Sequence, residues 1–221
     1  MKRSVNAIFL IPGILACFSC EPETPKTGPE LVEKSIRYHD PKGEWGELKA
    51  TFFLNDSLPP GRDSRSYEFA VDNSKSQMSY SIEGLKYEVW SDSLVQIQGE
   101  IEKERALRMR NYYTYLWGLP MKLRDPGTLI EKEIKTEEVK GKNYLVVRVP
   151  YDMDIWYFYF DPETYKMEAY KFYKDEPNQI GEIIFLEGEI EFSKMKIPAN
   201  RTWFRTENQE FLGTDMLLEI R

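Results

Sequence analysis

The sequence predicts an α+β protein in which one curled antiparallel sheet, a half-barrel of about 11–12 strands, is covered on its concave face by helices. Three observations lead to this fold class. Short segments of alternating apolar and polar residues recur along most of the chain, separated by turn residues. Helical periodicity appears in only two places, near the start and in the middle. The 12 Phe, 5 Trp and 14 Tyr supply enough apolar surface to fill such a sheet.

An N-terminal helix is expected over residues 29–39. Thr27 and Glu30 fit the Ser/Thr-x-x-Glu capping pattern, and the dipeptide Asp40-Pro41 ends the helix. His39, the single histidine, falls in the last turn, where it is expected to cap the final carbonyl groups of its own helix.

Strand signals occupy two blocks on either side of a second helical segment, residues 101–117, which contains no turn residue and ends at Gly118. The segments are 48–54, 67–71, 87–89 and 95–97 in the first block, and 145–151, 156–160, 165–173, 186–192, around 203 and 212–220 in the second. A meander of this many twisted strands curls, so its inner face must be filled. The N-terminal helix and the inserted helical segment are the two candidates.

The N-terminus has the pattern of a secretory signal. Lys2 and Arg3 precede an apolar stretch at residues 7–16 that is too short to span a bilayer. Residues 14–17, Ile-Leu-Ala-Cys, resemble a bacterial lipobox, and residues 17–20 are a looser match. We therefore expect residues 1–20 to be a lipoprotein signal peptide with lipid attached at Cys17 (alternative Cys20), residues 21–28 a flexible tether, and residues 29–221 one domain.

Several function classes are excluded by composition. With 30 Lys+Arg against 37 Asp+Glu, the net charge of -7 argues against nucleic-acid binding. No cysteine follows Cys20, so the domain has no disulfide, Cys-ligated metal or cysteine nucleophile. Glycine-rich nucleotide loops and His pairs are absent, and Asp152 and Asp154 fit a solvated loop better than a Ca²⁺ site. Glu187, Glu189 and Glu191 fit a solvated strand face. We expect no metal, no cofactor and no enzymatic activity.

The candidate ligand site combines the second helical segment with the aromatic strand at residues 156–160. Apolar residues of the helical segment would face a cleft, and its arginines would meet a phosphate or carboxylate head group. A core helix whose arginines pair with acidic residues is the competing interpretation. The candidate ligand-binding residues are Arg105, Arg108, Met109, Tyr112, Tyr113, Leu116, Trp117, Trp156, Phe158 and Phe160. Tyr157 and Tyr159 take the opposite face, so this strand is expected to be covered on both sides.

The order of the expected elements resembles the LolA/LolB-like fold, which handles lipoproteins and other lipids in the envelope of Gram-negative bacteria. Four segments also resemble a family of bacterial lipoproteins of unknown function. They are residues 38–45 (YHDPKGEW), 110–128, 156–176 and 212–215 (LGTD). The resemblance names a family and a fold, and it carries over no catalytic residue.

These observations predict a lipid-anchored protein of the cell envelope, at the outer membrane and on either its periplasmic or its surface side. It would bind a lipid or other hydrophobic ligand without catalysis in the half-barrel cleft. The alternative is a module that docks an envelope protein and holds no small ligand. An occluded apolar cavity of several hundred Å³ would favour the first function, and a filled core the second.

Overall fold

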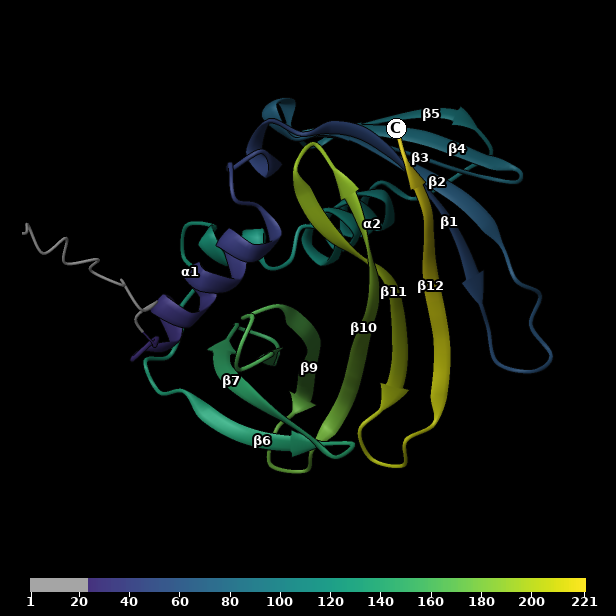
Figure 1. The fold of residues 1–221 in the computed structure, drawn as a ribbon. Helices are drawn as coiled ribbons and strands as arrows, with labels where there is room; N and C mark the ends of the chain where they lie inside the picture. The colour runs from purple at the N-terminus through teal and green to yellow at the C-terminus, as the bar shows by residue number, and fades with distance from the viewer. Residues whose placement is uncertain (1–23) are drawn as a thin grey trace, which may run out of the picture.

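A computed structural model describes residues 24–221 as one open antiparallel sheet with two α-helices (Figure 1). The first half of the described chain contains α1 (Gly28–His39), β1 (Lys49–Ser57), β2 (Ser66–Asp72), β3 (Gln77–Ile82), β4 (Leu85–Trp90), β5 (Ser93–Gln98) and α2 (Lys103–Trp117). The second half contains β6 (Lys135–Val139), β7 (Lys142–Pro150), β8 (Ile155–Phe160), β9 (Met167–Asp175), β10 (Ile180–Phe192), β11 (Met195–Arg205) and β12 (Phe211–Ile220). Short 3₁₀ turns η1 (Trp45–Glu47), η2 (Asn73–Lys75) and η3 (Met121–Arg124) connect some of them.

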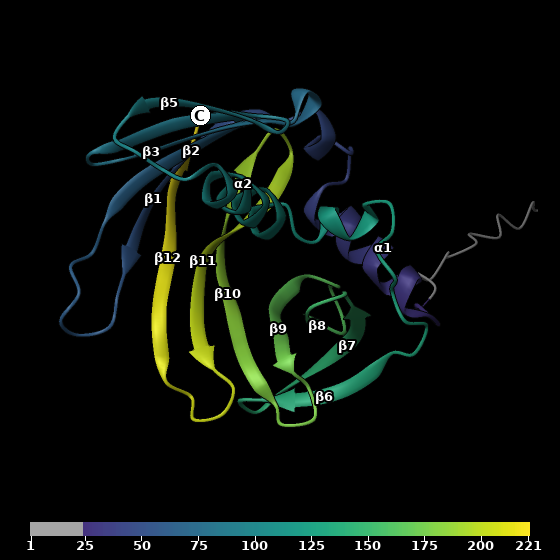
Figure 2. The same cartoon turned by 180° about the vertical axis from the view of Figure 1, so that it is seen from behind.

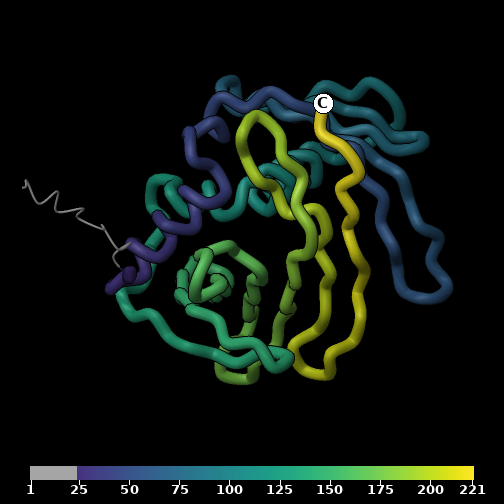
Figure 3. The backbone as a smooth tube through the Cα atoms, viewed as in Figure 1, coloured from purple at the N-terminus to yellow at the C-terminus, as the bar shows by residue number. Residues whose placement is uncertain are grey.

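The strand order explains why the sheet is a single curled layer. Across the sheet it is β5-β4-β3-β2-β1-β12-β11-β10-β9-β8-β7-β6. The chain therefore starts in the middle, runs out to β5, crosses through α2 and η3 to the far edge at β6, and returns hairpin by hairpin (Figure 3). Its last strand pairs with its first, Phe52 opposite Ile220. The predicted curled antiparallel sheet with two helical segments is confirmed.

The helices lie on the concave side of the sheet, and β6–β9 roll tightly round below them (Figures 1 and 2). The buried face of α2 carries Ala106, Tyr113, Leu116 and Trp117. Tyr113 stacks on Phe69 of β2 at 4.9 Å, and Phe69 stacks on Phe52 of β1 at 4.6 Å. These rings fill the concavity of the β1–β5 half, so the apolar stripe of the second helix packs into the core.

The first helix begins as its capping pattern predicts. Thr27 Oγ accepts the Glu30 N–H at 3.4 Å, and the Gly28 N–H donates to the Lys132 carbonyl at 2.9 Å. At the other end the Asp40 N–H donates to the Ile36 carbonyl at 2.6 Å. Gly28 sits where a Cβ would lie 2.1 Å from the Glu131 carbonyl oxygen, so only glycine fits this close approach.

The expected capping role of His39 is wrong. Its side chain is fully buried, Nδ1 donates to the Lys196 carbonyl at 2.7 Å, and Nε2 accepts the Met167 N–H at 3.1 Å. His39 therefore bonds the ends of two strands instead of the carbonyls of its own helix. Glu189, expected to be simply solvated, accepts a hydrogen bond from the Tyr38 hydroxyl at 3.0 Å and lies 3.4 Å from Lys166 Nζ.

The aromatic strand β8 is covered on both faces, as its sequence predicts. Phe158 and Phe160 are buried in the main core, while Tyr159 is buried on the other face in a small second cluster. The Tyr159 hydroxyl donates to Glu137 at 2.9 Å. Lys171 Nζ lies 5.1–5.4 Å from the ring centroids of Tyr157, Tyr159 and Tyr173 and covers this outer layer.

Two findings bear on the membrane. Within residues 24–221 no helix has the length and apolar character needed to cross a bilayer. The expected signal peptide, with both candidate lipid-attachment residues Cys17 and Cys20, and residues 21–23 of the expected tether lie outside the described residues.

Candidate functional site

A groove of about 740 Å³ opens between α2 and the concave face of strands β8–β11. Its volume falls within the range of small-molecule sites. Six of its lining residues are aromatic, and four charged residues lie among them. The lining residues are Arg108, Asn111, Tyr112, Tyr115, Leu116, Tyr151, Asp154, Trp156, Phe172, Lys174, Glu182 and Trp203.

Strand register aligns the aromatic floor. Trp156 of β8 pairs with Phe172 of β9, which pairs with Glu182 of β10, so the three side chains form one row on the concave face. The Trp156 and Phe172 rings stack at 4.9 Å with an interplanar angle of 25°. Trp203 of β11 lies one row further along the sheet. The Tyr112 ring of α2 stacks on its indole, with ring centroids 6.1 Å apart.

The helix and the β7–β8 loop are bonded to each other across the groove. Tyr115 Oη and Tyr151 Oη lie 2.8 Å apart, and each ring packs edge-on against Trp156. Burial raises the pKa of both hydroxyls, so both are neutral at physiological pH. This contact fixes the width of the groove at one end.

The charged lining residues Arg108, Asp154, Lys174 and Glu182 form no ion pair within the described part of the chain. This differs from the outer surface, where Arg148, for example, pairs with Glu176 at 2.8 Å. Burial raises the pKa of Glu182, and nearby Lys174 partly opposes that rise. The groove is thus an aromatic trough bordered by polar groups that are open to a ligand.

A buried polar cluster lies directly behind the floor. Asp215 accepts hydrogen bonds at 3.0 Å from the Tyr67 hydroxyl and from Nε1 of Trp203, and so orients the indole that lines the groove. Burial raises the pKa of Asp215, and both hydrogen bonds oppose that rise. On the neighbouring strand Arg201 is 1% exposed, and its guanidinium lies 3.4 Å over the Trp117 ring.

The residues predicted from the sequence divide between groove and core. Arg108, Tyr112, Leu116 and Trp156 line the groove. Tyr113, Trp117, Phe158 and Phe160 lie in the core, and Met109 packs partly against it. Arg105 is exposed and lies outside the lining.

The sequence reasoning missed Phe172 and Trp203, among other lining residues. Both residues lie in segments that the sequence predicts to be strands, as Trp156 does, and this was the information from which they could have been found. Which residues stand opposite Trp156 depends, however, on the register between strands.

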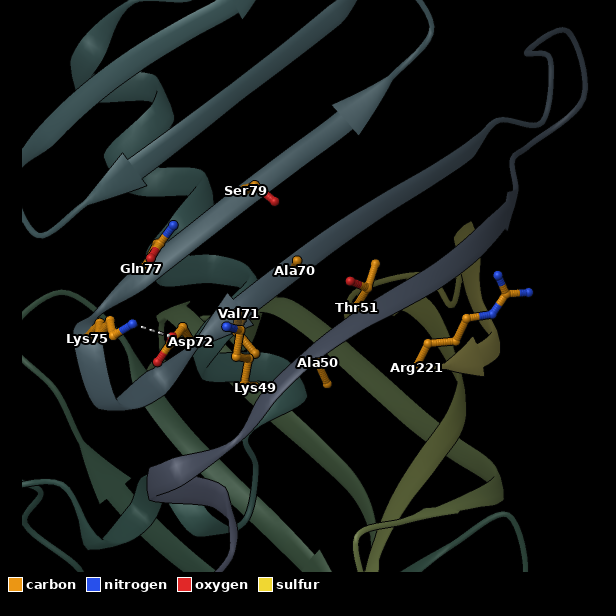
Figure 4. Close-up of a pocket in the computed structure, with 10 residues that line it drawn as sticks. All are labelled: Lys49, Ala50, Thr51, Ala70, Val71, Asp72, Lys75, Gln77, Ser79 and Arg221. Carbon is orange, nitrogen blue, oxygen red and sulfur yellow. Dashed lines mark ion pairs between the residues drawn. The ribbon is translucent and has the colours of Figure 1, made fainter.

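A second depression, of about 430 Å³, lies on β1–β3 and at the end of the chain (Figure 4). Its lining is mostly small or polar, and at one end of it Lys75 pairs with Asp72, three residues earlier in the chain, at 3.4 Å. It has none of the aromatic rings that distinguish the groove. In residues 24–221 no group of three or more His, Cys, Asp or Glu side chains is placed to hold a metal ion.

The family described as "Family of unknown function (DUF6503)" matches residues 6–220. The chain belongs to this family. No curated protein matches its sequence.

Its fold is shared with solved structures that are only distantly related in sequence. A LolA superfamily protein from Nitrosomonas europaea aligns with a TM-score of 0.54 at 9% identity, covering 88% of this chain and 93% of that one.

Two further solved structures share the fold to a similar degree. A putative outer membrane lipoprotein-sorting protein domain from Vibrio parahaemolyticus aligns with a TM-score of 0.55 at 10% identity over 88% of this chain and 91% of its own. A DUF1329 family protein from Desulfovibrio piger aligns with a TM-score of 0.54 at 8% identity over 89% and 93%. At these identities the likeness establishes a LolA-like fold for this DUF6503 chain.

Proposed function

We propose that this DUF6503 chain is a lipid-anchored protein of the cell envelope that binds a lipid or other hydrophobic ligand, without catalysis, in the groove between α2 and strands β8–β11. The observation that carries the proposal is the groove itself: about 740 Å³ in volume and lined by six aromatic side chains. Such a lining removes an apolar chain from water, which is the main source of affinity for lipids. The lipoprotein-sorting description of one structural neighbour agrees with this ligand class.

The groove is open to solvent, and the space beneath α2 is filled by Tyr113 and Trp117. The groove is therefore large enough for a ligand of lipid size. Because it is open to solvent, such a ligand would be only partly buried. One apolar chain lying along Trp156 and Phe172, with its polar end near the charged lining residues, satisfies both conditions.

The single histidine and the two bonded tyrosines of the groove are not placed to act as general bases. Both ring nitrogens of His39 are hydrogen-bonded in the protein interior, so its imidazole has no access to a substrate. Tyr115 and Tyr151 bond to each other, and burial keeps them neutral. The side chains of the groove are therefore better suited to binding a ligand than to catalysing a reaction.

Anchoring rests on the lipobox-like residues before Cys17 and on the position of the first helix. The Gly28 N–H bonds to Lys132, and the neighbouring Glu131 N–H bonds to the Arg148 carbonyl at 3.0 Å, three residues before Tyr151. The tether would thus join the domain on the edge that carries the groove's β7–β8 loop. Two apolar residues on this edge, Leu129 and Met153, are 64% and 84% exposed, as expected for an edge held towards a membrane.

Native mass spectrometry of protein purified from envelopes without detergent tests the proposal. We expect an adduct of lipid mass that organic extraction removes. Tyr112→Glu places a charge in the groove and should reduce occupancy at least tenfold. Trp90→Glu is a matched control, because Trp90 is 51% exposed on β4 and lies outside the groove. A clean apo mass that persists after incubation with envelope lipids would refute ligand binding.

One observation favours the alternative, a protein-docking function. Trp90, Val95 and Ile97 are 49–51% exposed on β4 and on the edge strand β5, and together they form an apolar patch. If this patch docks a partner, a photo-crosslinker at position 97 should give one discrete adduct in cells. The same crosslinker at Leu218, which is 58% exposed on β12, should give none.

A further inference from the structure

The aromatic floor of the groove ends in charged side chains. Trp156, Phe172 and Glu182 pair in register across β8, β9 and β10. Lys174 lies two residues beyond Phe172 on β9, so its side chain is on the same face of the sheet, one row further along. Asp154 lies two residues before Trp156 and lines the same end of the groove. The sheet therefore supplies one cation and two carboxylates where the aromatic floor stops.

The second helix supplies a fourth charge. Arg108 lies one turn before Tyr112, whose ring stacks on Trp203, so the arginine and the tyrosine share one face of α2. Both line the groove. With Arg108 included, the lining contains two basic and two acidic side chains, and their formal charges sum to zero.

These four side chains make no hydrogen bond or ion pair with one another or with any other residue in the described range 24–221. Lys174 opposes the rise in pKa that burial causes at Glu182, so the two charges are near each other without being paired. Side chains placed diagonally on neighbouring strands are roughly 7–8 Å apart, which leaves room for a group between them. Elsewhere the chain pairs such charges directly, as Lys142 pairs with Glu168 at 2.6 Å.

We propose that the ligand of the groove is a lipid with a zwitterionic head group, in which an ammonium group is joined to a phosphate. The ammonium group would lie between Glu182 and Asp154, and the phosphate would meet Lys174 and Arg108. The acyl chain would lie along the aromatic floor. This inference rests on the proposed function, because it names the head group of the ligand in the same groove.

The balance of charges in the lining selects a head group with both signs. An anionic head group without an ammonium would be attracted by Lys174 and Arg108 but repelled by Glu182 and Asp154. A cationic amphiphile would meet the same conflict with the signs reversed. A neutral head group would gain nothing from any of the four charges. Only a zwitterion complements all of them, and the repulsion of the other classes adds to its selection.

Three ligands with the same lauroyl chain test the inference. Lauroyl lysophosphatidylethanolamine and lauroyl lysophosphatidylglycerol share the phosphate, and only the first has an ammonium group. Monolauroylglycerol has neither charge. Affinities are measured by titration calorimetry with delipidated protein, at low salt and below the micelle concentration of each ligand, because salt screens exposed charges.

Two variants remove one charge of each sign with little change of shape. They are Glu182→Gln and Lys174→Gln. Glu187→Gln is the matched control for the first, because Glu187 is exposed on the same strand and lies outside the groove lining. Lys86→Gln is the control for the second, because Lys86 is exposed on β4 and also lies outside the lining.

The wild-type protein should bind the ethanolamine lipid about fivefold more tightly than the glycerol phospholipid, since a half-buried carboxylate meets the ammonium. Glu182→Gln should abolish this preference. Lys174→Gln should weaken both phospholipids about fivefold and leave monolauroylglycerol unchanged. Neither Glu187→Gln nor Lys86→Gln should change any of the three affinities.

The outcomes separate this inference from the proposed function. Equal binding of the two phospholipids, tighter binding of the glycerol phospholipid, or a preference that Glu182→Gln leaves intact would overturn the zwitterionic head group and leave hydrophobic binding standing. If none of the three ligands binds, the proposed function is overturned as well.

Urea unfolding of the ligand-free protein separates a binding role of Glu182 from a structural one. Because its carboxylate has no partner within residues 24–221, Glu182→Gln should leave the unfolding midpoint unchanged or raise it. A lower midpoint would show that Glu182 stabilises the fold, and would overturn its assignment to the head group.

Discussion

Nε2 of His39 accepts the backbone N–H of Met167 at 3.1 Å, which bonds the last residue of the first helix to the first residue of β9. Because Nδ1 of the same ring donates to the Lys196 carbonyl at 2.7 Å, the neutral imidazole holds the helix against two strands. The helix needs this attachment, since it covers the open side of the curled sheet (Figure 2).

The buried imidazole makes folding stability depend on pH. Burial lowers the pKa of His39 from 6.5 to about 4. Below pH 6.5 the unfolded chain therefore binds a proton that the folded protein does not, and stability should fall by about 3 kcal/mol as the pH reaches 4. Urea unfolding of wild type and His39→Gln between pH 7.5 and 4.5 measures this contribution as a difference between the two proteins.

At pH 7.5 the His39→Gln protein should be less stable by about 2 kcal/mol, because the glutamine reproduces the geometry of both hydrogen bonds poorly. Its disadvantage should shrink as the pH falls below 6.5 and turn into a small advantage by about pH 4.5, since wild type alone carries the cost of keeping a buried histidine neutral. A difference that stays constant with pH would contradict this account.

Gly181 allows β9 and β10 to come together beside the groove. A Cβ at this position would lie 1.9 Å from the Phe172 carbonyl oxygen, so Gly181→Ala forces apart the strands that carry Phe172 and Glu182. We expect a loss of about 2 kcal/mol in unfolding free energy and a lower occupancy of the groove by ligand. Gly46→Ala is the matched control, because a Cβ at Gly46 would meet no atom within 4 Å. Equal effects of the two substitutions would argue against a steric role for Gly181.

The sequence predicts those features of the fold that depend on residues close together in the chain. Both helices are encoded by neighbours three or four residues apart, and the Thr27 cap and the buried stripe of α2 appear where those patterns place them. The edge strand β6 lacked a recognisable pattern. Its residues, Lys135–Val139, are mostly charged, as suits an edge that must not pair with another chain.

Long-range features were outside the reach of local patterns. The bonding partners of His39 lie 128 and 157 residues away along the chain, so its last-turn position wrongly favoured capping. In the same way Trp156 was a candidate from its own strand, but Phe172 and Trp203 join it only through the register of neighbouring strands. Arg201 gave no signal at all, because its burial depends on the packing of α2 over β11.

The hydrogen bond between the Tyr115 and Tyr151 hydroxyls should restrain the β7–β8 loop. Tyr151→Phe removes it at a cost of about 1 kcal/mol and should speed amide hydrogen exchange at residues 151–155. A double-mutant cycle isolates the bond: Tyr115→Phe combined with Tyr151→Phe should cost little more than either change alone. Strict additivity of the two effects would mean that the hydroxyls do not interact.

The lipid anchor is tested by separating the two cysteines. Metabolic labelling with an alkyne-tagged fatty acid should label the wild-type chain, and Cys20→Ser should retain the label, because residues 14–17 are the closer match to a lipobox. Cys17→Ser should lose it and release the protein from the membrane fraction, since one polar domain without acyl chains has no bilayer affinity of its own. Retention of the label in Cys17→Ser together with its loss in Cys20→Ser would move the attachment site to Cys20. If the wild-type chain and both variants all remain unlabelled, the lipid anchor is refuted. The groove would then have to take up its ligand from solution.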